Sequence, residues 1–254
     1  MKLRHVRHAT SLLQYAHRSF LVDPVFAEKG SLPPIPLTPC KRPNPLTELR
    51  TPLGLLLQAE TLLSTHLHRD HFDARARELL DPETPVLCQP QDAGTFREWG
   101  FRDVHPVEDS LLWEGITVTR LDALHGTGAV GESMAPASGY VLAAPGEPVV
   151  YFAGDTIYHE SIREHIARYR TEVVVLNAGS PKFLHSDRIV MNLLDVEKTL
   201  RENPEPRYVL VHLDAFNHCI ETREDCREYF TPERLRATGA RELLIPEDDE
   251  TLAF

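Results

Sequence analysis

The feature that most constrains this 254-residue chain is the histidine-rich run H-L-H-R-D-H at residues 66–71. It follows the strand-like stretch 62–65, and we expect a helix to begin near Asp73. Side chains two residues apart on extended backbone share a face, so the first two histidines can grip one metal ion. A turn after Arg69 would direct the side chains of Asp70 and His71 towards a second metal position. The run predicts a metal site, and a loop of solvated histidines is the competing interpretation.

One loop cannot supply all the ligands of a metal pair, so the fold must bring other strand ends to this run. Three candidates each stand just past an apolar run: His125, Asp155 and His212. Taken singly, each suits a structural role better than a ligand role. Their shared placement after a strand, together with the histidine-rich run, favours a common site. Imidazole and carboxylate donors suit zinc and other first-row divalent ions.

Short apolar runs separated by turn residues predict a chain rich in strands. The predicted strands are 3–7, 11–15, 19–22, 61–65, 85–88, 110–113, 116–121, 139–143, 149–153, 173–176, 208–211 and 243–245. The later runs are continuously apolar, which is typical of strands covered on both faces, and they alternate with helices. This order predicts an α/β fold of two mixed β-sheets packed face to face with helices outside.

Two helices carry local signals at their ends. Asp195 is expected to cap a helix over 196–202. Thr231 followed by Pro232 predicts the start of another helix, and Gly239 predicts its end.

The length and the 42% hydrophobic content fit one domain over residues 1–254. Within it, the segment 27–52 holds seven prolines, which exclude a regular helix or a central strand. This Pro-rich segment is therefore expected to be an irregular loop. A lid over a site and a plain surface excursion are both open.

Composition narrows the classes of partner. The formal net charge of −11 opposes attraction to a phosphate backbone, so nucleic acid is not expected to bind. The four cysteines form no C-x-x-C pair. No stretch suits a secretory signal or a membrane span, which predicts a cytoplasmic protein without membrane contact. A small-molecule substrate is expected, and homo-oligomerisation stays open.

The ordered motifs are similar to those of the metallo-β-lactamase superfamily. They are the 66–71 run, the later His125, the triplet Gly154-Asp155-Thr156 and His212. This resemblance implies a four-layer αββα sandwich and a metal-dependent hydrolase. The segments 7–10 (R-H-A-T) and 21–24 (L-V-D-P) resemble the opening of the branch that contains the ascorbate-6-phosphate lactonase-like hydrolases.

The resemblance also implies a role for each site residue. It assigns His66, His68 and His125 to a first metal, Asp70, His71 and His212 to a second, and Asp155 to a bridge between them. His218 is a rival for the last ligand, and either His218 or His8 would contact substrate or support the ligands. Asp23 would lie beneath the site, although a turn role before Pro24 is equally open. The electron-transferring di-iron relatives typically carry a glutamate at the position of His68, so this histidine favours hydrolysis.

The implied cofactor is a pair of divalent ions, with Zn²⁺ expected and Mn²⁺ or Fe²⁺ as alternatives. Such a pair would hold a bridging hydroxide, and Asp70 would orient it and shuttle a proton. A lactone, ester or amide is the expected substrate. A small phosphodiester is an alternative substrate, and Lys182 and Arg188 are the candidate cations that would bind its phosphate. A non-catalytic metal-binding regulatory protein is an alternative function. Further rim candidates are His159, Asn177, His185 and Asp187.

Overall fold

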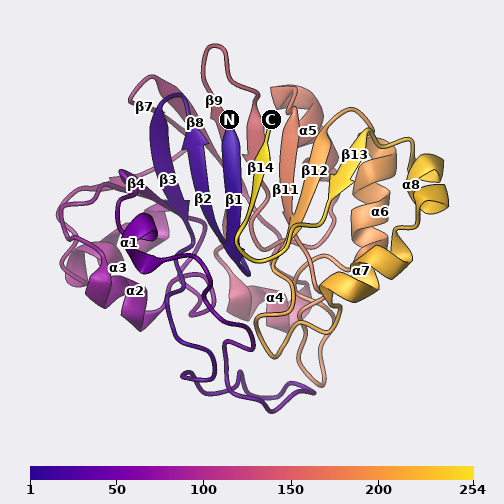
Figure 1. Cartoon of the computed structure of the whole chain (residues 1–254), viewed down its shortest axis with the longest axis horizontal. Helices are drawn as coiled ribbons and strands as arrows, with labels where there is room; N and C mark the ends of the chain where they lie inside the picture. The colour runs from indigo at the N-terminus through magenta and orange to yellow at the C-terminus, as the bar shows by residue number, and fades with distance from the viewer.

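The computed structural model describes all residues from 1 to 254, arranged around two seven-stranded sheets (Figure 1). The first sheet has the order β14-β1-β2-β3-β4-β5-β6. Its strands are β14 (Glu250–Ala253), β1 (Lys2–Arg7), β2 (Thr10–Tyr15), β3 (Arg18–Val22), β4 (Thr61–Ser64), β5 (Val86–Cys88) and β6 (Val104–Pro106).

The second sheet has the order β13-β12-β11-β10-β9-β8-β7. Its strands are β13 (Glu242–Leu244), β12 (Arg207–Val211), β11 (Val173–Asn177), β10 (Val150–Phe152), β9 (Ser138–Ala143), β8 (Ile116–Asp122) and β7 (Ser110–Trp113). Each sheet is mixed. In the first sheet, β14-β1-β2-β3 pair antiparallel and β3-β4-β5-β6 pair parallel. In the second, β7-β8-β9-β10 pair antiparallel and β10-β11-β12-β13 pair parallel. The predicted pair of mixed sheets is confirmed.

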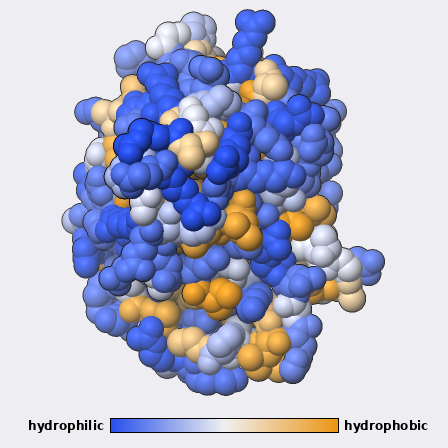
Figure 2. Space-filling view, turned by 90° about the vertical axis from the view of Figure 1, so that its right-hand side faces the viewer, coloured by the Kyte–Doolittle hydropathy of each residue, from blue (hydrophilic) through white to orange (hydrophobic).

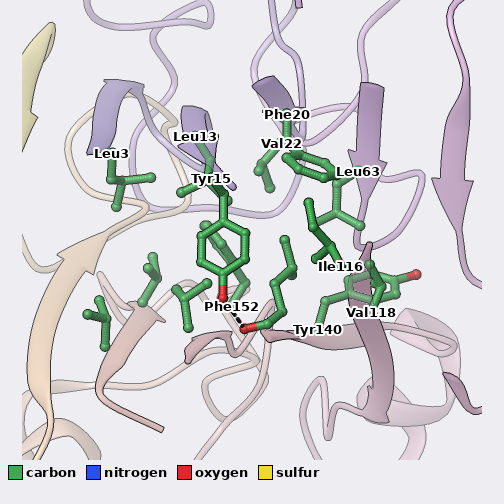
Figure 3. Packing of buried hydrophobic residues seen from close by; sticks show 14 of the residues in the cluster. Leu3, Leu13, Tyr15, Phe20, Val22, Leu63, Ile116, Val118, Tyr140 and Phe152 are labelled. Carbon is green, nitrogen blue, oxygen red and sulfur yellow. Dashed lines mark hydrogen bonds between the residues drawn. The ribbon is translucent and has the colours of Figure 1, made fainter. Parts of the chain in front are cut away.

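The main core lies between the two sheets, where the inward faces of both interdigitate (Figure 3). Leu13, Phe20 and Leu63 come from the first sheet, and Val118 and Phe152 come from the second. All five side chains are buried. Burial of each such side chain contributes roughly 1.5–3 kcal/mol relative to its exposure to water, so this layer holds the sheets together.

Helices cover the outer face of each sheet, which completes the four-layer sandwich. The helices are α1 (Leu53–Leu56), α2 (Ala74–Leu79), the 3-10 helix η1 (Pro90–Asp92), α3 (Ala93–Glu98), α4 (Gly128–Met134), α5 (Glu160–Tyr169), α6 (Leu193–Glu202), α7 (Arg223–Tyr229) and α8 (Pro232–Thr238). Of these, α4 lies below the sheets in Figure 1 and not on an outer face. Phe72 and Phe96 pack against the first sheet, whereas Ile162, Val196 and Leu200 pack against the second. Figure 2 views the side that carries α6, α7 and α8, where hydrophilic residues predominate and apolar ones are scattered.

The start of α6 differs from the prediction. Asn192 is the N-cap, and its side-chain oxygen accepts a hydrogen bond from the backbone N–H of Asp195 at 2.9 Å. Asp195 therefore lies in the first turn, where its carboxylate receives the guanidinium of Arg188 at 2.7 and 2.8 Å. The prediction for α8 is confirmed, since Thr231 caps it and Gly239 ends it with a φ of 77°. Strands β6 and β14 were not predicted.

The Pro-rich segment runs below the sheets in Figure 1 as irregular backbone. Two buried side chains hold it. Arg7 donates to the carbonyls of Val25, Ala27 and Thr47 at 2.9–3.1 Å. Asn217 contacts it further along, through hydrogen bonds with Ile35, Thr38, Cys40 and Asn44. No helix of the protein is long and apolar enough to cross a bilayer.

Candidate metal centre

The histidine-rich run follows the C-terminal end of β4, an interior strand of the first sheet, and turns sharply. The backbone N–H groups of His71 and Phe72 both donate to the carbonyl of His68, at 2.8 and 2.9 Å. Asp73 then caps α2 by accepting from the N–H of Ala76 at 2.7 Å, as predicted. This turn reverses the chain within one short loop, so the side chains of the run converge.

Three imidazoles meet at the first position. The Nδ1 of His68 lies 2.9 Å from the Nε2 of His66 and 3.2 Å from the Nε2 of His125, which follows β8 of the second sheet. Three nitrogens that bind one tetrahedral ion at about 2.0–2.1 Å lie roughly 3.4 Å apart. The observed separations are close to that spacing, so this group fits a single ion.

A second group lies beside the first, around two carboxylates. The Nε2 of His71 is 3.2 Å from the Oδ1 of Asp155. The Nε2 of His212 is 3.6 Å from that oxygen and 3.6 Å from the Oδ2 of Asp70. The other oxygen of Asp155, Oδ2, lies 3.5 Å from His125 Nε2. Asp155 thus faces both groups, which is the geometry that a bridging carboxylate needs.

Two nitrogens in this second group are buried without a hydrogen-bond partner, the Nε2 atoms of His71 and His212. Unpaired buried polar atoms are rare because each costs about 1–3 kcal/mol. A divalent ion bound by both nitrogens would remove that cost. The donor set of imidazole and carboxylate is also the one that Zn²⁺, Mn²⁺ and Fe²⁺ accept.

The opposite ring nitrogens are held from outside the site. His125 Nδ1 lies 2.8 Å from the carbonyl of Ile189, and His212 Nδ1 lies 3.2 Å from that of Ala178. His71 Nδ1 lies 2.8 Å from the Oδ2 of Asp23. Such partners fix the orientation of a metal-binding imidazole and keep its other nitrogen free for the ion. All three Nε2 atoms therefore point into the site.

Asp23 is itself well anchored beneath the histidine-rich run. Its Oδ1 accepts from the backbone N–H of Thr65 at 2.8 Å, and its Oδ2 accepts from the Thr65 hydroxyl at 2.6 Å. The Thr65 hydroxyl also lies 3.1 Å from His66 Nδ1. Thr65 thus contacts His66 directly and holds Asp23, which contacts His71. The sequence analysis did not predict this role of Thr65.

His8 packs directly against His212. Their ring centroids are 3.7 Å apart, and the backbone N–H of His212 donates to the carbonyl of His8 at 2.9 Å. Both residues have left-handed backbones, with φ of 59° and 68°. Non-glycine residues hold that conformation at a cost, and such strain concentrates at functional sites. The Nε2 of His8 also reaches the Oδ2 of Asp70 at 3.3 Å, so His8 contacts both residues.

His212 and His218 differ in how they approach Asp70. The Nε2 of His218 lies 3.2 Å from its Oδ2, nearer than that of His212. However, the donor atoms that cluster with those of Asp70 and His71 belong to His212 and His8. His218 instead lines the open pocket. The geometry therefore favours His212 as the deeper donor.

Burial and neighbouring charges set the protonation of the ion-free site. Burial lowers the pKa of His125 to about 4. For His71, burial acts in the same direction, but the negative charges of Asp155 and Asp23 outweigh it and raise the pKa to about 10. Burial would raise the pKa of Asp155, yet the charges of His212 and His71 hold it well below its usual range. The carboxylate is therefore ionised and able to bind a cation.

An open pocket of about 360 Å³ leads to this cluster. The cluster contributes His68, Asp70, His125 and Asp155 to its walls, and His218 lies beside them. The remaining lining residues are Ile35, Pro36, Arg69, Met134, Phe183 and Ile189. The sequence left a lid role open for the Pro-rich segment that contains Ile35 and Pro36. It indicated no role for Arg69, Met134, Phe183 or Ile189, which belong to loops and to the end of α4.

The other rim candidates are dispersed. Asn177 donates its side-chain N–H to the Oδ1 of Asp155 at 2.7 Å, so it supports the cluster. Lys182 and Arg188 do not line the pocket, and Arg188 is paired with Asp195. His159, His185 and Asp187 also lie outside the pocket lining.

Comparison with known proteins decides the family. Residues 18–213 match the model of the beta-lactamase superfamily domain. The chain belongs to the metallo-β-lactamase superfamily. It is 31% identical to the UPF0173 protein YddR of Bacillus subtilis, with 100% of both chains covered. It is 26% identical over 190 residues to a UPF0173 metal-dependent hydrolase of Xanthobacter autotrophicus, which covers 70% of this chain and 72% of that one.

A solved structure extends the comparison. The isothiocyanate hydrolase from Delia radicum gut bacteria is 32% identical and superposes with a TM-score of 0.93, over 100% of this chain and 99% of the other. These relatives identify the present chain as a metal-dependent hydrolase. The αββα sandwich is confirmed by the same comparison. The narrower resemblance to the lactonase-like branch stays a prediction.

Proposed function

We propose that this hydrolase uses two divalent ions, and that it attacks an electrophilic carbon of a small molecule such as a lactone, an ester or an amide. One observation carries the proposal: two groups of donor side chains, buried except for the half-buried His68, lie side by side, and Asp155 faces both. The ligands of the first ion would be His66, His68 and His125. Those of the second would be Asp70, His71 and His212, with Asp155 bridging both.

When bound, the two ions supply a hydroxide at neutral pH and positive charge for the oxyanion of the transition state. The protein supplies position. Asp70 lies at the wall of the pocket, and contacts with His212, His218 and His8 outweigh burial and keep the pKa of its carboxyl well below the usual range. It is therefore ionised at neutral pH, which suits it to orient the attacking water as a hydrogen-bond acceptor.

Isothiocyanate hydrolysis is a second candidate, favoured by the similarity to the isothiocyanate hydrolase over the whole chain. An isothiocyanate, R–N=C=S, also has an electrophilic carbon. Water adds through its oxygen to that carbon, the C–N bond then breaks, and both water protons end on nitrogen. The products are an amine and carbonyl sulfide. The proposed site is suited to this attack for the same reason that it is suited to an ester.

The phosphodiester alternative has less support. Enzymes that cleave phosphate esters commonly place cationic side chains around the phosphate. Of the cations considered from the sequence, neither Lys182 nor Arg188 lines the pocket. Among the lysines and arginines, Arg69 lines the pocket. The wall is otherwise apolar or part of the metal cluster, which favours attack on carbon.

We also propose that the Pro-rich segment forms a fixed wall of the pocket within a single domain spanning residues 1–254. Ile35 and Pro36 line the pocket. Asn217, next to His218, accepts from the N–H of Ile35 at 2.9 Å and donates to its carbonyl at 3.1 Å. These bonds support a wall that is present before substrate arrives.

The test is a panel of substrates assayed with protein loaded separately with Zn²⁺, Mn²⁺ or Fe²⁺. The panel comprises a lactone, a p-nitrophenyl ester, benzyl isothiocyanate and bis-p-nitrophenyl phosphate. We expect turnover of carbon electrophiles that disappears on chelation. His68→Ala and Asp70→Ala should each lower kcat/KM by roughly a thousandfold or more, whereas His185→Ala, which lies outside the pocket, should not.

Three results would count against the proposal. Full turnover by rigorously metal-free protein would exclude the mechanism. Selective cleavage of the phosphodiester would favour the alternative substrate, and the absence of any turnover by metal-loaded protein would favour a regulatory role.

A further inference from the structure

Besides the metal cluster, the wall of the pocket is built from apolar side chains of three separate segments. Ile35 belongs to the Pro-rich segment, Met134 ends α4, and Phe183 and Ile189 lie in the loop between β11 and α6. Two of these segments are joined directly, because the backbone N–H of Leu184 donates to the carbonyl of Leu37 at 2.7 Å. The Pro-rich segment and the loop between β11 and α6 are therefore held together at the pocket.

Part of this wall is rigid. Ile189 is 3% exposed, and its carbonyl lies 2.8 Å from His125 Nδ1. Its side chain leaves no room at Gly126, where a Cβ would lie 3.0 Å from the Ile189 Cγ2. Phe183 is half-buried, and its backbone N–H donates to the Ser186 hydroxyl at 3.1 Å. A half-buried aromatic ring beside a fixed aliphatic surface can gain burial when a ligand enters.

The wall offers little to a charged group. The carboxylates that line the pocket, Asp70 and Asp155, belong to the metal cluster, and Arg69 is exposed. A charged substituent placed against Ile35, Met134 and Phe183 would lose water without gaining a partner, which is costly. An apolar substituent gains about fourfold in affinity for each buried methylene.

We propose that the pocket selects substrates whose non-reacting substituent is uncharged and apolar, about the size of a phenyl or hexyl group, and that Phe183 determines this selectivity. The volume of about 360 Å³ accommodates such a group together with the reacting carbon. The inference rests on the proposed metal site, which would hold the reacting end. It concerns the substituent and is independent of which carbon electrophile is cleaved.

The test measures binding rather than turnover. Hydroxamates chelate divalent ions, so they anchor at a metal while their substituent probes the wall. Zinc-loaded protein is titrated by calorimetry with acetohydroxamate, hexanohydroxamate, 3-phenylpropanohydroxamate and the charged succinic monohydroxamate. We expect hexanohydroxamate and 3-phenylpropanohydroxamate to bind at least about tenfold more tightly than acetohydroxamate. The succinic compound should gain nothing.

Variants assign the effect to Phe183. Phe183→Ala should remove most of the tenfold gain and leave acetohydroxamate binding unchanged. Phe183→Lys should reverse the preference and favour the succinic compound. Leu112→Ala, at a 73%-exposed leucine of β7 outside the pocket, is the matched control and should behave as the wild type.

The outcomes separate the two proposals. If acetohydroxamate binds only to metal-loaded protein but longer apolar chains add nothing, the selectivity inference is wrong and the metal site stands. A preserved gain in Phe183→Ala would exclude the role of that residue. If no hydroxamate binds, the proposed metal site fails and the inference fails with it.

Discussion

His71 is the residue whose surroundings most directly express a metal-binding role. One ring nitrogen faces Asp155, and the other is 2.8 Å from Asp23. A carboxylate behind a metal-binding imidazole raises the basicity of the ring and fixes its orientation. Because Asp23 takes two further hydrogen bonds from Thr65, its own position is also fixed.

We expect Asp23→Asn to weaken Zn²⁺ binding by about 10–100-fold, because the amide keeps the shape of the carboxylate but not its charge. Competition with a chromophoric chelator measures the dissociation constant. Asp81→Asn, at an exposed aspartate on the surface, is the control. Equal affinities of wild type and Asp23→Asn would show that Asp23 has only a turn-forming role.

At the scale of elements, α6 joins the neighbouring helices through Glu197. Its Oε2 accepts from the Tyr229 hydroxyl of α7 at 2.5 Å and from Arg234 Nε of α8 at 3.1 Å. Its Oε1 accepts from Arg201 at 2.6 Å. The Tyr229 hydrogen bond, followed by those of the two arginines, lowers the pKa of Glu197 to about 2 despite an opposing effect of burial.

This shift predicts a pH-dependent stability. Because the pKa is lowered in the folded state, the stabilisation by Glu197 is complete above its unfolded pKa near 4.5 and is lost as pH falls towards 2. Glu197→Gln should therefore lower the free energy of unfolding by about 1–3 kcal/mol at pH 7, with a smaller difference at pH 3.5. Urea unfolding at both pH values tests this. Glu233→Gln, at an exposed glutamate of α8, is the control and should lower the free energy of unfolding by less. If the difference between wild type and Glu197→Gln did not change with pH, the link between the Glu197 pKa and stability would be wrong.

The Pro-rich segment depends on a different buried side chain, Arg7. The guanidinium is fully buried, and burial, opposed by Asp73, Asp248 and Glu48, lowers its pKa to about 10. It remains charged at neutral pH and holds both ends of the segment through carbonyl groups.

Arg7→Met should free those carbonyls and loosen the segment. We expect faster hydrogen exchange in peptides covering 27–47, measured by mass spectrometry, with protection of β11 and β12 unchanged. Arg50→Met, at an exposed arginine in the same segment, provides the comparison. Unchanged exchange in Arg7→Met would mean that the Asn217 contacts alone hold the segment.

At the scale of the whole molecule, the candidate ligands are divided between the two sheets. The 66–71 run follows β4 of the first sheet, whereas His125, Asp155 and His212 follow β8, β10 and β12 of the second. Ions bound there would connect the two halves of the sandwich, in addition to the apolar core between them.

We therefore expect metal to raise the melting temperature. At a free Zn²⁺ concentration 100 times the dissociation constant, the gain is about 2.7 kcal/mol, or roughly 5–10 °C for a chain of this size. Scanning calorimetry with Zn²⁺ and with chelator measures it. Asp155→Ala should abolish most of the shift, and the same shift in that variant would argue that Zn²⁺ binds elsewhere.

Sequence reasoning located the strands and the candidate ligands better than the pocket wall. Buried strands carry continuous apolar runs, and the candidate ligands follow such runs directly. Strand β14 escaped because most of its side chains are exposed and show no such run. The prediction that Asp195 caps α6 is wrong, since the side chain of Asn192, three residues earlier, accepts the N–H of Asp195 and is the cap. Phe183 and Ile35 could not be placed, since tertiary contacts fix their loops.

The division of the candidate ligands between the sheets also bears on when metal enters. The last of the proposed ligands, His212, lies in the final fifth of the sequence. During synthesis, an emerging chain can present the histidine-rich run early, but it lacks the second half of the site until β12 has been made. Completion of the metal pair would thus follow the folding of both sheets, and the second ion would be acquired by a nearly finished protein rather than direct its folding.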